Sequence, residues 1–146
     1  MRRMRAVRVR VRMRLMTRFV IGPDVALVLA AERATIAPDH QLVAPTLLRS
    51  QVLTMLFEAV ARGELDRAEA SRRLDFLRGL RMRLLGDRVL QANAWRIADE
   101  LGFPDTYTAE YIALTRLQAD AFVTLDPRLA EAVRGLVRVA PLDDLR

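Results

Sequence analysis

Short apolar runs alternate with longer amphipathic stretches from Thr17 onward, and this alternation restricts the fold more than any other feature of the sequence. The apolar runs at residues 19–21, 41–44 and 121–125 have the length of buried strands. Strands joined by helical crossovers run parallel, and a parallel sheet needs helices on both faces. The sequence therefore predicts an α/β fold, a three-layer α/β/α sandwich around a short parallel sheet. Residues 19–21 and 121–125 are expected as adjacent central strands.

Proline, glycine and aspartate mark where the predicted helices begin and end. Pro23 suits the first turn of a helix, Asp66 and Asp87 suit N-cap positions, and Gly63 and Gly102 suit helix ends. The other expected elements are helices over 46–63, 66–80, 87–102, a stretch after residue 107 and 125–136, and strands at 82–86 and 137–141.

Composition narrows the class of protein further. A chain of 146 residues with 52% hydrophobic content fits one domain, expected over residues 17–146. Without cysteine it has no disulfide, thiolate nucleophile or cysteine-based metal site. No apolar run approaches the roughly 20 residues that a membrane-spanning helix needs. We therefore expect a cytoplasmic protein that does not contact a membrane.

The positive charge is concentrated at the N-terminus. Residues 1–18 hold eight of the 24 basic residues and no acid, so residues 19–146 carry sixteen basic against eighteen acidic residues. Residues 8–15 alternate arginine with apolar side chains, a pattern that fits either an arm for polyanions or a solvated tail. Met16 would also be a natural start just before the first strand. Residues 1–16 are accordingly interpreted as an Arg-rich tail, disordered or arising from a start site assigned too early.

Two residues with ring side chains, His40 and Trp95, are expected to have structural rather than functional roles. His40 is the chain's single histidine, and its place in the segment APDHQ favours a surface loop over a general base. Trp95 lies on a predicted helix among apolar neighbours, so core packing is expected rather than stacking on a nucleic-acid base.

Three segments carry a resemblance to a known family. These are the strand end at FVIGPD, the segment APTLLRSQVL, and the block DTYTAEYIALTRLQADAFVTLD near the C-terminus. Together they resemble the PIN-domain family, in particular the VapC-like ribonuclease toxins of toxin-antitoxin pairs, over about residues 18–141. The most specific part is YTAEYIAL followed by ADAFVTLD, where the spacing of Thr124 and Asp126 is similar to the final strand motif of that family.

The resemblance implies a site of four acids that hold Mg²⁺ or Mn²⁺ for RNA cleavage. Residue by residue, only Asp126 matches, with Thr124 in support. The other three positions fall on Gly22, Gln51 and Thr108, which are not acidic. Because Mg²⁺ prefers oxygen ligands and carboxylates also supply charge, the loss of three acids weakens the expected metal binding and activity.

Two neighbouring acids are possible replacements. Asp24 lies two residues after Gly22, and a turn at Pro23 would bring it over the strand end. Asp105 lies three residues before Thr108, on the same side of a helical turn if the helix begins early. Each equally suits a capping role at the start of a helix, so both readings remain open. Glu110 is excluded, since two residues after Thr108 on a helix it points nearly the opposite way.

Two functional hypotheses follow from the resemblance. The first is a divalent-metal-dependent endoribonuclease of the VapC-like toxin type with a depleted acidic site, in which Asp126 and Asp24 are catalytic and Asp126, Asp24 and Asp105 hold the metal. The second is a catalytically inactive PIN-like module that binds an antitoxin or RNA. The resemblance also implies a homodimer, with the helical hairpin at 66–80 and its apolar face of Leu74, Leu77 and Leu80 available for contacts.

Overall fold

The computed structural model describes residues 16–146, so almost all of the predicted Arg-rich tail lies outside the described residues. Four strands form one all-parallel sheet in the order β3-β2-β1-β4. The strands are β1 (Thr17–Ile21), β2 (His40–Pro45), β3 (Met82–Leu85) and β4 (Ala121–Val123). The predicted parallel sheet is confirmed.

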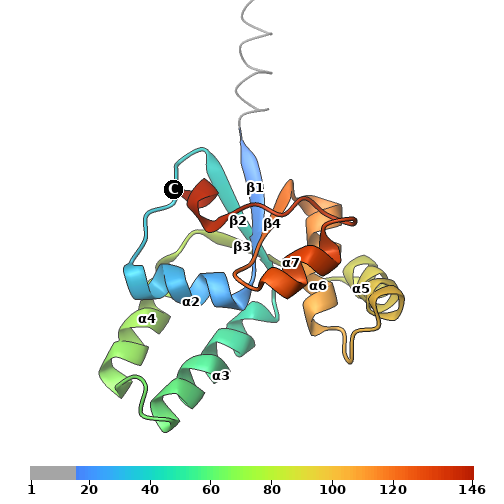
Figure 1. The fold of residues 1–146 in the computed structure, drawn as a ribbon. Helices are drawn as coiled ribbons and strands as arrows, with labels where there is room; N and C mark the ends of the chain where they lie inside the picture. Colours follow the sequence, from blue (N-terminus) through green and yellow to red (C-terminus); the bar gives the residue numbers. More distant parts are fainter. Residues whose placement is uncertain (1–15) are drawn as a thin grey trace, which may run out of the picture.

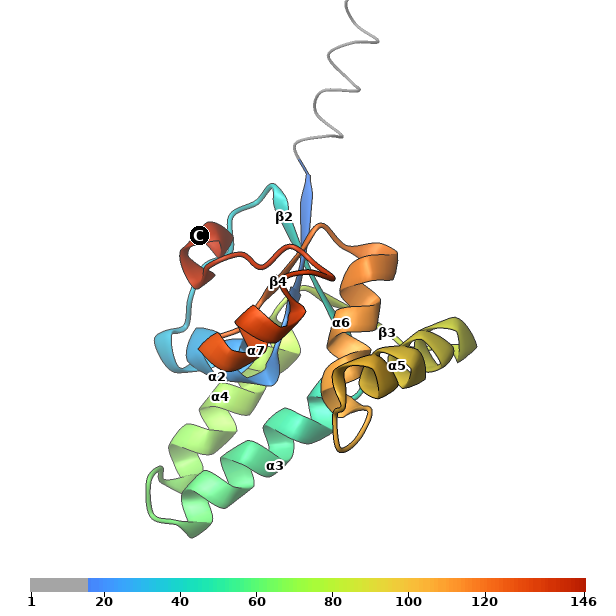
Figure 2. The ribbon, with the colours of Figure 1, turned by 45° about the vertical axis from the view of Figure 1, so that its right-hand side comes forward.

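Six helices surround this sheet in the part of the chain that the structure describes. They are α2 (Pro23–Glu32), α3 (Leu48–Ala61), α4 (Arg67–Gly79), α5 (Arg88–Leu101), α6 (Tyr107–Gln118) and α7 (Pro127–Val133), with a final 3-10 turn, η1 (Leu142–Leu145). Figure 2 shows α2 and α7 on one side of the strands and α6 with α5 on the other. The predicted three-layer α/β/α sandwich is therefore present.

The helix boundaries follow the predicted capping residues. Asp66 accepts a hydrogen bond from the backbone N–H of Glu69, and Asp87 accepts one from that of Leu90. Gly102 ends α5 at a φ of 67°, in the left-handed region that glycine enters without steric cost. Local chemistry thus sets the start of α4 and both ends of α5.

The hydrophobic core lies between the sheet and its helices. Ile21, Phe122 and Leu42 from three neighbouring strands are almost fully buried, as are Ile112 and Leu114 of α6. Because parallel strands are covered on both faces, their side chains form continuous apolar runs rather than alternating ones. This explains why the strands were recognisable despite their short length.

The C-terminal part of the sheet differs from the prediction. β1 and β4 are adjacent, with Val20 opposite Phe122, but β4 ends at Val123 and lies at the edge of the sheet. The expected strand at 137–141 is reduced to a single bridge between Phe122 and Val139. Ala140 still donates its N–H to the carbonyl of Phe122, and the next residue, Pro141, has no N–H with which to extend the ladder.

Both ring-bearing residues are placed differently from expectation. His40 begins β2, and its ring meets the Phe19 ring edge-on at a centroid distance of 5.0 Å. Its Nδ1 is buried without a hydrogen-bond partner among the described residues. Trp95 is 69% exposed on α5 rather than packed in the core.

The connection of strands and helices determines where a site can form. All four strands point their carboxyl ends the same way, and the hairpin of α3 and α4 projects beyond that edge of the sheet (Figure 1). In folds of this kind ligands bind at the carboxyl edge of the strands. No helix within residues 16–146 is long and apolar enough to cross a membrane.

Candidate functional site

A small polar hollow lies at the carboxyl edge of the sheet, which we call the strand-end hollow. It has a volume of about 160 Å³ and is lined by Gly22 directly after β1 and by residues of α2, α3, α6, β4, α7 and the segment between β4 and α7. Its lining includes Gly22, Asp24, Gln51, Thr108, Tyr111, Thr124 and Asp126. The four positions singled out by the family resemblance therefore meet at one place, together with Asp24 and Thr124.

Asp24 uses both carboxylate oxygens within the protein. Oδ1 accepts a hydrogen bond from the backbone N–H of Val25 at 2.8 Å. Oδ2 accepts one from the Thr124 hydroxyl at 3.0 Å and one from the backbone N–H of Leu125 at 2.8 Å. Asp24 therefore joins the first turn of α2 to the end of β4, a role that neither capping nor metal binding had suggested.

The carboxylate of Asp24 also occupies the space next to Gly22. A Cβ built on Gly22 would lie 2.5 Å from Asp24 Oδ1, closer than real Cβ atoms approach an oxygen. Gly22 itself donates its N–H to the carbonyl of Val123 at 3.1 Å and so continues the pairing of β1 with β4. An acid at residue 22 and the observed position of Asp24 are therefore mutually exclusive.

Asp126 begins helix α7. Its Oδ1 accepts hydrogen bonds from the backbone N–H groups of Arg128 at 2.9 Å and Leu129 at 3.2 Å. Its own N–H donates to the Thr124 hydroxyl at 3.2 Å. The Thr124 hydroxyl thus connects the backbone of Asp126, whose N–H it accepts, with the carboxylate of Asp24, to which it donates.

Gln51 and Tyr111 form the opposite wall of the hollow. The Tyr111 hydroxyl donates to Gln51 Oε1 at 2.5 Å. Burial raises the pKa of Tyr111 well above its ordinary value, and the nearby carboxylates of Glu110 and Asp24 raise it further. Tyr111 therefore remains a neutral donor, which occupies the one oxygen that Gln51 presents. Tyr111 was not predicted as a site residue, although the YIAL motif contains it.

Asp105 does not reach the hollow. Its Oδ1 accepts a hydrogen bond from the backbone N–H of Tyr107 at 3.0 Å, which places it in the turn before α6. Of the two roles predicted for Asp105, this hydrogen bond fits the capping role. The geometry does not support Asp105 as a metal ligand. Glu110 is likewise absent from the lining of the hollow, and partial burial raises the pKa of its carboxyl.

The residues of the strand-end hollow do not match the needs of Mg²⁺ or Mn²⁺. No cluster of three or more His, Cys, Asp or Glu side chains suited to a metal occurs within residues 16–146. The hollow has two carboxylates, and three of their four oxygens already accept hydrogen bonds from the protein. Only Asp126 Oδ2 has no such bond among the described residues. A divalent ion in the hollow would have this one free carboxylate oxygen, and any second carboxylate oxygen that it bound would also carry a hydrogen bond of the fold.

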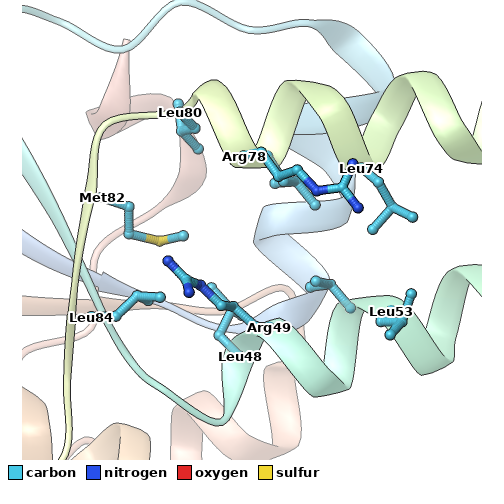
Figure 3. Close-up of a pocket in the computed structure, with 10 residues that line it drawn as sticks. Leu48, Arg49, Leu53, Leu74, Arg78, Leu80, Met82 and Leu84 are labelled. Carbon is cyan, nitrogen blue, oxygen red and sulfur yellow. The ribbon is translucent and has the colours of Figure 1, made fainter.

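A second, larger depression lies along the α3–α4 hairpin, and we call it the hairpin groove. It has a volume of about 490 Å³ and continues into a neighbouring depression of about 480 Å³. Figure 3 shows Arg49 reaching from α3 toward Met82, while Arg78 extends from α4 toward Leu74. The groove is lined by Leu48, Arg49, Val52, Leu53, Leu74, Leu77, Arg78, Leu80, Met82 and Leu84.

The groove and its neighbouring depression contain large apolar side chains that are exposed to solvent. Leu53 is 54% exposed, and Phe57 in the neighbouring depression is 73% exposed. The predicted apolar face of the hairpin contributes Leu74, Leu77 and Leu80. Arg49 and β3 were not predicted as parts of this surface; β3 follows α4 directly and its pairing with β2 places Met82 and Leu84 at the groove.

Comparison with known proteins supports the fold. No protein-family model matches the sequence, and no curated protein matches it. Among solved structures, the crystal structure of PAE2754 from Pyrobaculum aerophilum is similar, with a TM-score of 0.67 and 21% sequence identity. The match covers 88% of this chain and 93% of that chain. At this identity the likeness concerns the arrangement of strands and helices.

Proposed function

We propose that this chain is a PIN-like module of the VapC-like type in which metal-dependent RNA cleavage is weak or lost, and that it acts by binding a partner protein. The observation that carries the proposal is the state of the two carboxylates in the strand-end hollow. Asp24 and Asp126 are the only acids there, and their hydrogen bonds stabilise the junctions of β4 with α2 and α7.

The small number of carboxylates in the hollow supports the proposed loss of cleavage. Two unit charges about 4 Å apart interact by about 4 kcal/mol at an effective dielectric of about 20, so each missing carboxylate removes a large term from metal affinity. Gln51 and Thr108 offer neutral oxygens, and the Gln51 oxygen is already bonded to Tyr111. Neutral oxygens do not replace the charge that a divalent ion needs.

The hairpin groove supports partner binding. Leu53 of α3 is exposed, and the half-buried Leu74 and Leu77 of α4 extend the apolar floor, with Arg49 and Arg78 beside it. Arg49 forms no ion pair among the described residues, whereas Arg78 pairs with Asp75 at 2.8 Å. Such a surface suits an amphipathic segment with apolar anchors and nearby acids, the chemistry expected of a small antitoxin.

RNA cleavage in the presence of Mn²⁺ tests the proposal. The full chain should cleave single-stranded RNA no faster than the Asp126→Asn variant, because neither protein assembles enough charge for the metal. The variant keeps a polar side chain at the start of α7, which preserves the helix. Efficient cleavage by the wild type that disappears in Asp126→Asn would overturn the proposal.

That contrary outcome would favour the second candidate function, a ribonuclease with a rearranged site. The observation in its favour is that Asp24 and Asp126 lie in the same hollow and are joined through Thr124. In that case Asp24→Asn should abolish cleavage as completely as Asp126→Asn, while Asp105→Asn should leave it unchanged.

A further inference from the structure

The two edges of the sheet differ in how their backbone groups are satisfied. At the β4 edge, Phe122 donates its N–H to the carbonyl of Arg138 and accepts a hydrogen bond from the N–H of Ala140. The C-terminal segment therefore closes that edge. Strand β3 forms the opposite edge, and among the described elements it pairs with β2 alone. The β3 edge is thus open to another extended chain.

The direction of the β3 backbone groups follows from its pairing with β2. The Leu85 carbonyl accepts a hydrogen bond from the N–H of Thr46, so the backbone groups of Leu85 are directed toward β2. Because these groups alternate in direction along a strand, those of Met82 and Leu84 are directed away from β2. They form no backbone hydrogen bond within residues 16–146. Such unpaired groups on an edge strand are a template for a further strand.

The side chains of β3 give this edge one apolar and one basic face. Met82 and Leu84 line the hairpin groove (Figure 3), whereas Arg83 is exposed, as is Arg81 just before the strand. Since successive side chains of a strand point to opposite faces, Arg83 leaves the sheet on the face away from the groove. Neither arginine forms an ion pair in the part of the chain that the structure describes.

Charge determines which kind of strand fits this edge. A second β3 laid antiparallel would gather the arginines of both copies on one face, and like charges opposite each other on neighbouring strands are destabilising. An acidic strand instead places carboxylates beside Arg81 and Arg83. Its alternate apolar side chains then lie beside Met82 and Leu84, on the face of the groove. The edge therefore suits an acidic segment of another protein and disfavours a second copy of this chain.

We infer that an extended, acidic segment of the partner protein adds to the sheet as a strand beside β3, with its alternate apolar side chains toward the hairpin groove. The inference rests on the proposed function, because it specifies how the partner of that function binds. In strand addition, main-chain hydrogen bonds supply affinity and the alternate side chains supply specificity. A helix seated in the groove would leave the backbone groups of Met82 and Leu84 unpaired.

A synthetic peptide tests strand addition to the full chain. The fluorescein-labelled peptide EVEIEVE alternates acids with apolar residues, and fluorescence anisotropy should give a dissociation constant of about 100 µM or lower. Two modified peptides, N-methylated at the glutamates or at the apolar residues, each lose the N–H groups along one edge. One of them should bind at least about tenfold more weakly and the other like the parent peptide, because only one edge faces β3.

The charge of the edge is tested on the protein. Arg83→Glu should weaken binding of EVEIEVE at least about tenfold and should permit binding of the basic peptide KVKIKVK. The matched control is Arg138→Glu, an exposed arginine in the segment that closes the opposite edge of the sheet, and it should change neither affinity. Both side chains are exposed, so both variants should melt close to the wild type.

Amide hydrogen exchange locates the bound peptide. The Leu84 N–H should exchange at least about tenfold more slowly in the complex, since it becomes hydrogen-bonded. The inference is overturned if EVEIEVE does not bind at about 1 mM, if both N-methylated peptides bind like the parent, or if Leu84 exchange is unchanged. RNA cleavage separates this inference from the proposed function. A peptide that fails with a wild type that does not cleave RNA removes strand addition alone, whereas cleavage by the wild type removes the proposed loss of activity.

Discussion

The strand-end hollow and the hairpin groove share helix α3 but use their side chains in opposite ways. In the hollow, Tyr111 donates to Gln51, and Asp24 and Asp126 accept hydrogen bonds that stabilise the fold. In the groove, Leu53 is more than half exposed and Arg49 has no ion-pair partner among the described residues. Polar residues that converge at strand ends can thus serve the fold itself, while an exposed apolar surface favours binding of another molecule.

The largest effect should come from restoring charge to the hollow. The variant Gly22→Asp/Asp24→Ala/Gln51→Glu/Thr108→Asp places three carboxylates around Asp126, and Asp24 is removed because its carboxylate occupies the space of a side chain at residue 22. Mn²⁺ should bind at least about a hundredfold more tightly than to the wild type, measured by calorimetric titration. Without metal the variant should be less stable, since its carboxylates repel one another.

The matched control for this variant keeps the shapes and removes the charges. It combines Gly22→Asn, Asp24→Ala and Thr108→Asn and retains Gln51, and it should bind Mn²⁺ no better than the wild type. If the acidic variant folds but also fails to bind, the strand ends do not converge as the hollow suggests.

The second effect concerns the bonds of Asp24. Asp24→Ala removes the bonds from the Thr124 hydroxyl and the Leu125 N–H, and should lower the free energy of unfolding by about 2–3 kcal/mol in urea titrations. Asp105→Ala is the control, because it removes one local bond and should cost about 1 kcal/mol or less. Equal losses in both variants would mean that Asp24 is no more than a helix cap.

The third effect appears at high pH. Burial raises the pKa of Tyr111 in the folded protein, so its contribution to stability is complete below about pH 10, the ordinary tyrosine value, and is lost as the pH rises beyond it. The slope contributed by one group is at most about 1.4 kcal/mol per pH unit. Tyr111→Phe should therefore flatten the alkaline decline of stability. Tyr107→Phe, at an exposed position, should not, and an unchanged decline in Tyr111→Phe would contradict the neutral, buried phenol.

The smallest effect on stability should arise in the groove. Leu53→Asp should change the free energy of unfolding by about 0.5 kcal/mol or less, because the side chain is already exposed. It should nevertheless reduce the fluorescence of the apolar sulfonate dye ANS by roughly twofold, since the dye suits leucines beside arginines. Leu117→Asp on α6 is the control and should leave dye binding unchanged. If the wild-type protein does not bind ANS, the groove is not an accessible apolar surface, and the proposed difference between the groove and the hollow is wrong.

Much of the fold could be predicted because its signals are local. The apolar run of β1, the capping residues Asp66 and Asp87, and Gly102 all act within a few residues, and each stands where the sequence indicated. The prediction of a strand at 137–141 was wrong, because Val139 forms a single bridge and Pro141 then ends the pairing. The exposure of Trp95 could have been predicted from its position on the helix. Successive residues of a helix are about 100° apart, so Trp95 points away from the direction of the buried Ala94.

The candidate site was only partly accessible from the sequence. The positions singled out by the family resemblance, Gly22, Gln51, Thr108 and Asp126, lie together at one edge of the sheet. The partners of Asp24 could not be predicted, because Thr124 lies 100 residues away and its hydroxyl is positioned by the pairing of β4 with β1. Spacing also could not show that Asp105 is held in its own turn.

Thermal unfolding of the full wild-type chain with and without Mn²⁺ tests the central claim most directly. The claim is that the carboxylates of the strand-end hollow hold the fold and do not hold a metal. The melting temperature should then be unchanged in 1 mM Mn²⁺. A site with a dissociation constant of about 10 µM would add about 2.7 kcal/mol at that concentration and raise the melting temperature by roughly 5–10 °C. A rise of that size in the wild type that is absent in Asp126→Asn would contradict the claim.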